Sequence, residues 1–125
     1  MTVSYNAALK STRMQAVIAA IDADASPATL EIGQTGMSLI IITFTLNDPS
    51  FSESGGIITM LGVPKSAVAA NPGTAQEARV KSGSGTIIVS GLSVNTSAAD
   101  IILNNIIINS GQTVNLNSGT LTHAP

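Results

Sequence analysis

From residue 28 to residue 123, short apolar segments alternate with turn residues, and this pattern constrains the fold more than any other feature. Gly, Pro, Asn and Ser interrupt the apolar segments every few positions, and no helical period of apolar residues returns after Pro27. Evenly spaced strands of this kind are typical of antiparallel sandwiches. A parallel α/β fold needs helices between its strands, and the pattern has none. We therefore expect a mainly β chain with an antiparallel β-sandwich or jelly-roll-like fold over residues 28–123.

One helix is expected before the strands, over residues 6–22. Apolar residues recur at three- and four-residue spacing up to Ile21, and Ser4 or Asn6 can cap the start. The segment from Asp22 to Pro27 ends the helix, because Asp, Ser and Pro compete with helical hydrogen bonding or forbid it. At 125 residues the chain has the size of one domain, so we expect a single domain over 1–125.

The clearest strand pairing is a hairpin around Gly83-Ser84-Gly85. The segment 74–82 alternates, with Ala78 and Val80 on one side and charged residues on the other, which predicts that it pairs antiparallel with 86–90. Gly91 is then expected as a turn before a separate strand over 92–95. Residues 37–46 are expected to form the longest strand, and residues 62–73 a long loop.

Low charge narrows the classes of partner. Charged residues make up 10% of the chain, where soluble domains carry about 25%. The net charge is -2, and the three aromatic residues are Tyr5, Phe44 and Phe51. Nucleic-acid binding needs clustered cations and aromatic platforms, so we expect no nucleic-acid partner. No apolar run approaches the roughly 20 residues of a membrane helix, so we expect no membrane partner.

Candidate catalytic and metal-binding residues are few. Asp22 and Asp24 lack the further oxygen ligands of a calcium loop, so we interpret them as part of the loop that ends the helix. His123 is the one histidine, and no cysteine is present to complete a zinc site. The glycine pairs at 55–56 and 83–85 carry no lysine of a phosphate loop and are interpreted as turns. We therefore expect no catalytic, metal or cofactor residues, and a chain that is not an enzyme.

Runs of consecutive isoleucine and leucine are the strongest anomaly. In a sheet with one exposed face only alternate residues should be apolar, so these runs need cover on both faces. The cover comes either from the helix and residues 62–73 of the same chain or from other copies of it. We favour contact with other copies for part of the surface, since large exposed apolar patches usually mark contacts. The expected interface residues are Leu39, Ile41, Ile57, Ile102, Ile106, Ile107 and Ile108.

Several segments in order along the chain resemble small virion proteins of tailed bacteriophages and prophages. The resemblance covers nearly the whole chain and is a match of pattern and order, without a catalytic signature. The segments that carry it are Leu9 to Val17, Ala20-Ile21-Asp22-Ala23, Leu30-Glu31-Ile32, Leu46 to Phe51, Gly73-Thr74-Ala75, Ala78 to Lys81, Ser90-Gly91, Thr96 to Ile101 and Ile106 to Thr122.

The resemblance implies a β-sandwich subunit present in many copies on the virion. The expected role is a capsid decoration or cement protein, a homotrimer that is made in the host cytoplasm and binds the major capsid protein at the capsid surface. The alternative is a tail or fibre module that contacts the host surface. The chain departs from related members in lacking Trp, which puts recognition by aromatic stacking in doubt. A glycan-cleaving enzyme ranks third, because it needs a convergent carboxylate pair and the chain has seven acidic residues.

Overall fold

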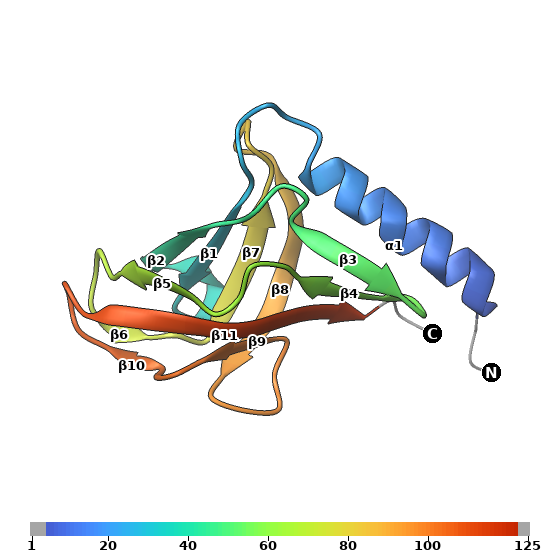
Figure 1. Cartoon of the computed structure of the whole chain (residues 1–125). Helices are drawn as coiled ribbons and strands as arrows, with labels where there is room; N and C mark the ends of the chain where they lie inside the picture. Colours follow the sequence, from blue (N-terminus) through green and yellow to red (C-terminus); the bar gives the residue numbers. More distant parts are fainter. Residues whose placement is uncertain (1–4, 123–125) are drawn as a thin grey trace.

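A computed structural model describes residues 5–122 and shows a mainly β fold with one α-helix at its N-terminal end (Figure 1). The helix α1 (Ala7–Ile21) comes first, and a short 3-10 helix η1 (Thr35–Met37) follows the first strand. The strands are β1 (Thr29–Gly33), β2 (Ile40–Thr45), β3 (Phe51–Ser54), β4 (Ile57–Met60), β5 (Lys65–Val68), β6 (Gly73–Thr74), β7 (Glu77–Lys81), β8 (Ile87–Asn95), β9 (Ile101–Leu103), β10 (Ile107–Ile108) and β11 (Thr113–Thr122). The expected fold class, mainly β with one N-terminal helix, is confirmed.

The strands form one large curled sheet and one small one. The large sheet has nine strands in the order β2-β1-β7-β8-β9-β11-β4-β3, with β5 paired to β11 beside this path, while β6 and β10 pair separately. The sheet curls around a shared apolar core, which gives a sandwich-like arrangement (Figure 1). The sequence predicted antiparallel pairing throughout, and this is wrong at one place, because β8 and β9 run parallel.

The parallel pair is closed by a short return loop. Parallel strands usually need a crossover of a dozen residues or more, yet residues 96–100 alone bring Ile101 beside Val94. Reciprocal bonds hold this loop: the Ser93 N–H donates to Asp100 Oδ2 at 3.1 Å, and the Asp100 N–H donates to Ser93 Oγ at 3.0 Å. These bonds join side chains to backbone groups seven residues apart, so no periodic pattern in the sequence predicts the parallel pair.

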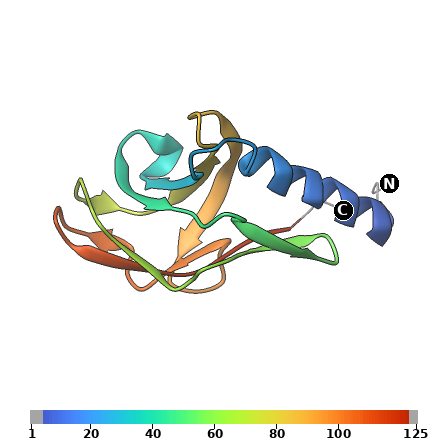
Figure 2. The same cartoon turned by 45° about the horizontal axis from the view of Figure 1, so that its top comes forward.

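Helix α1 begins and ends near the predicted positions. The Leu9 N–H donates to Oδ1 of the cap residue Asn6 at 2.7 Å, and the Asp22 N–H donates to the Ile18 carbonyl at 2.9 Å. Met14 and Ile21 are buried. The helix lies along the β3–β4 hairpin, and both project together from the rest of the sheet (Figures 1 and 2).

The β7–β8 hairpin is confirmed in pairing and in orientation. Val80 lies opposite Val89, and both Ala78 and Val80 are fully buried. Gly91, however, is not a turn between two strands. It lies inside β8 at a φ of +73°, beside register shifts in the β7–β8 ladder, so the two expected strands form one irregular strand.

Two other expectations are corrected. Residues 62–73 are not one loop, because they contain β5, whose Ala67 lies opposite Val114 of β11. The strand expected over 37–46 is not the longest. It begins only at Ile40, after η1 has ended at Met37, and has six residues, whereas β11 has ten. The register between β1 and β2 shifts next to Gly33, which lets both Ile41 and Ile42 be buried.

Candidate functional site

The expected interface residues divide between core and surface. Ile41 and Ile108 are 0% and 2% exposed, so both side chains belong to the core of this chain, and the expectation that they contact another copy is wrong. Ile41 turns inward at the β1–β2 register shift, and Ile108 lies in β10 opposite Gly73 of β6. Local cover, the alternative left open by the sequence, explains these two positions.

The other expected interface residues reach the surface to different degrees. Ile102 and Ile106 are half-buried, and Ile106 packs against the core. Leu39, Ile57 and Ile107 are exposed, and Ile107 most of all at 69%. Ile57 begins β4 and Ile107 begins β10, and these strands start at opposite ends of the molecule (Figure 1). The structure therefore does not bring the exposed members into one patch.

Sequence reasoning missed further exposed apolar residues. Val68 is 63% exposed, and Ile87 and Leu9 are also exposed. Val68 lies in β5, within the segment that the sequence predicts as a loop, because neighbouring alanines and prolines weaken the strand pattern. Lys65-Ser66-Ala67-Val68 does not alternate between polar and apolar residues, so periodicity gives no signal for this strand.

Asp22 and Asp24 connect loops within the chain. Asp22 Oδ2 accepts a bond from the Ser50 N–H, and Asp24 Oδ2 accepts one from the Ser84 N–H, both at 3.0 Å. The Ser84 backbone bond, together with Ser84 and Ser82 side-chain bonds, lowers the pKa of Asp24 below its ordinary value. Gly83 permits close approach here, since a Cβ on it would lie 2.1 Å from the Ser26 carbonyl oxygen.

A charged cluster joins two strands of the outer sheet face. Glu31 Oε1 lies 2.7 Å from Arg79 Nε and 3.2 Å from Lys81 Nζ. Burial alone would raise the pKa of Glu31, but the hydrogen bonds from Arg79 and Lys81 outweigh it and lower the pKa. The ionised form of Glu31 is therefore part of the folded arrangement.

Glu53 joins helix α1 to the β3–β4 hairpin. Its Oε1 accepts from Ser11 Oγ at 2.5 Å and from Gln15 Nε2 at 3.4 Å, and its Oε2 accepts from the Gly56 N–H at 2.9 Å. The bonds from Ser11 and Gly56 lower the pKa of Glu53. This carboxylate serves the docking of the helix.

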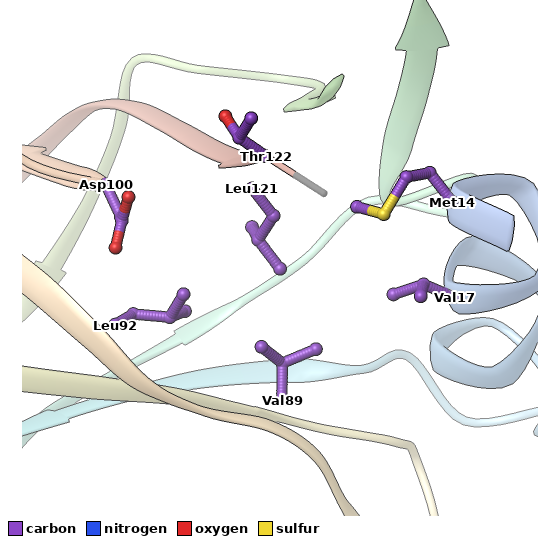
Figure 3. Close-up of a pocket in the computed structure, with 7 residues that line it drawn as sticks. All are labelled: Met14, Val17, Val89, Leu92, Asp100, Leu121 and Thr122. Carbon is purple, nitrogen blue, oxygen red and sulfur yellow. The ribbon is translucent and has the colours of Figure 1, made fainter. Parts of the chain in front are cut away.

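A pocket of about 220 Å³ lies between helix α1 and the sheet (Figure 3). Met14 and Val17 of α1 face Val89 and Leu92 of β8 and Leu121 of β11, so the lining is mostly apolar. Asp100 and Thr122 complete the lining, and the Asp100 carboxylate already accepts a bond from Ser93. No convergent set of free polar groups marks this pocket, among the residues described, as a site of chemistry.

Within residues 5–122 no group of three or more His, Asp or Glu side chains could hold a metal ion. His123 lies outside the described residues. No helix in the described part of the chain has the length and apolarity to cross a membrane. Comparison of the chain with protein-family models, with curated proteins and with solved structures gives no match.

Proposed function

We propose that the chain is a structural subunit of a bacteriophage virion and, within the particle, a capsid decoration protein. It binds the major capsid lattice as a homotrimer and has no enzymatic activity. The resemblance of its ordered segments to small virion proteins of tailed phages supports this assignment. The structural observation that carries it is Ile107, whose side chain is 69% exposed on β10 of a chain that has little charge to keep copies apart.

The state of the acidic side chains supports the non-catalytic part of the proposal. Glycan hydrolysis requires two carboxylates that face a common substrate. Here Asp22 and Asp24 accept bonds from backbone N–H groups of distant loops, and Asp100 accepts one from the Ser93 N–H of the neighbouring strand β8. Glu31 and Glu53 are engaged by cations and by helix α1 respectively. Carboxylates used in this way serve to hold the fold.

The experiment is to locate and count the protein in purified phage particles. Copies are counted against the major capsid protein in a quantified gel, and their position is found by particle reconstruction. Hundreds of copies on the head support decoration. A handful of copies at the tail contradicts decoration and favours the tail or fibre alternative, while absence from the particle contradicts both.

A further inference from the structure

In the described part of the chain, the outer face of one half of the large sheet carries no charged side chain. This half consists of β11, with β4 and β5 lying end to end along it and β3 beside β4 (Figure 1). Its outward positions hold Ser, Thr or Asn, apart from the aliphatic Ile57 and Val68. We call this surface the β11 face; it is formed by the outward positions within 51–54, 57–60, 65–68 and 113–122.

The charged residues closest to the β11 face are turned away from it. Glu53 of β3 bonds to helix α1 on the inner side of the sheet. Lys65 of β5 donates to Asn47, in the loop after β2, at 2.5 Å. Asp100, just before β9, accepts from the Ser93 N–H of β8. The β11 face is therefore neutral over four strands.

The other half of the sheet has a different outer face. There Glu31 of β1 meets Arg79 and Lys81 of β7. Charged residues are depleted at the centres of protein interfaces, because burying a charge costs far more free energy than burying a hydroxyl that finds a partner. The neutral β11 face is accordingly the half of the sheet that is suited to burial against another protein surface.

The chemistry of the β11 face makes it complementary to itself. Hydroxyl and amide side chains both donate and accept hydrogen bonds, so two identical faces of Ser, Thr and Asn can bond to each other. A charged face would instead repel its own copy. A cross-strand row such as Ser52, Thr59 and Thr120 therefore finds suitable partners in the same row of a second copy.

The two aliphatic side chains lie at opposite ends of the β11 face. Ile57 is 41% exposed and lies opposite Thr122, while Val68 is 63% exposed and lies opposite Thr113. Both are on the edge of β11 that faces away from β9. A two-fold axis in the plane of the face, at right angles to β11, exchanges these two ends. It places Ile57 of one copy over Val68 of the other, at both ends of the contact.

We propose that the β11 face packs against the β11 face of a second copy of this chain, as two stacked sheets related by this two-fold axis. Stacked sheets lie about 10 Å apart with their strands nearly aligned. Ten residues of β11 and three strand widths give a face of roughly 34 by 14 Å, so two copies bury on the order of 1,000 Å². This is the lower end of specific interfaces, so the association is reversible. It does not rest on the virion role, and a two-fold contact can join two trimers.

The test is sedimentation equilibrium of the full chain between about 10 μM and about 1 mM, a range that spans a weak association. The mass of the wild type is expected to double reversibly with concentration. Ile57→Lys and Val68→Glu each place a charge against an aliphatic side chain at both ends of the contact. Each variant alone is expected to weaken the association at least about tenfold. Both side chains are exposed, so the melting temperatures are expected to stay close to that of the wild type.

An equal mixture of the two variants tests the two-fold arrangement. In a mixed pair the introduced lysine faces the introduced glutamate at one end, and the native Val68 faces the native Ile57 at the other. The mixture is therefore expected to recover most of the association that each variant has lost. A mixture that stays as dissociated as its components contradicts the proposal.

A second variant and a matched control keep the test independent of the two ends. Thr59→Lys, between the aliphatic residues, is expected to weaken the association as they do. Thr45→Lys, at an exposed threonine of β2 in the other half of the sheet, is expected to leave it unchanged. A wild type of constant mass up to about 1 mM contradicts the proposal, and so does an Ile57→Lys variant that associates like the wild type. A trimer on the capsid that all these variants leave intact, without any doubling of its mass, contradicts this contact and leaves the decoration role standing.

Discussion

The Glu31 carboxylate forms ion pairs with both Arg79 and Lys81, and all three side chains are partly buried. Charge at this residue therefore contributes to the stability of the fold. Glu31→Gln is expected to lower the free energy of unfolding by about 1 kcal/mol or less at pH 7, as for other partly exposed ion pairs. The folded pKa of Glu31 lies below its ordinary value of 4.5, so this stabilisation is present above pH 4.5 and is lost as pH falls through the folded pKa.

Urea denaturation of the wild type and Glu31→Gln at pH 7 and in steps below pH 4.5 checks this prediction. The difference between the two proteins is expected to shrink as the pH falls. Asp48→Asn is the control, since Asp48 is an exposed acid outside the cluster. A difference that stays constant down to the lowest pH would show that Glu31 acts through packing and not through its charge.

Asp22 is the second residue with a specific structural role. Its carboxylate accepts the backbone N–H of Ser50, which is fully buried. Asp22→Ala is expected to lower the free energy of unfolding by about 1–3 kcal/mol, because the buried N–H is left without a partner. Asp22→Asn keeps an acceptor and should recover most of the loss in a denaturation experiment. Equal losses for the two variants would exclude this explanation.

At the scale of elements, helix α1 depends on a few buried side chains. Ile21 is 0% exposed, while Leu9 on the same helix is 42% exposed. Ile21→Ala is expected to cost about 2–5 kcal/mol through the cavity it leaves. Leu9→Ala serves as the matched control and should cost less than about 1 kcal/mol. Thermal and urea denaturation measure both, and similar losses would mean that the helix does not dock through Ile21.

At the scale of the whole molecule, a substitution at the exposed Ile107 tests assembly without much effect on the stability of the fold. Its side chain is mostly outside the core, so Ile107→Asp is expected to change the free energy of unfolding by less than about 0.5 kcal/mol. If the decoration role holds, binding to phage particles that lack the protein falls at least about tenfold, measured by co-sedimentation. Ser110→Asp, an exposed polar position nearby in the sequence, is the control. Unchanged binding of Ile107→Asp would remove Ile107 from the contact.

Much of the local structure could be predicted from the sequence. The capping Asn6, the apolar spacing up to Ile21 and the alternation around Val80 each depend on neighbours within a few positions, and all three were confirmed. The candidate surface was predicted less well, because an isoleucine run looks the same whether its cover comes from the same chain or from another. Ile41 and Ile108 were assigned to a contact, and the fold buries both.

The sequence by itself determined the fold class, the helix and the β7–β8 hairpin, since these follow from periodicity and turn residues that act over short distances. The tertiary structure alone decided the parallel β8–β9 pair, the strand in residues 65–68 and the burial of Ile41 and Ile108. These features depend on which distant strands become neighbours and on the phase of their hydrogen bonds. That information arises only when the whole chain has packed around one core.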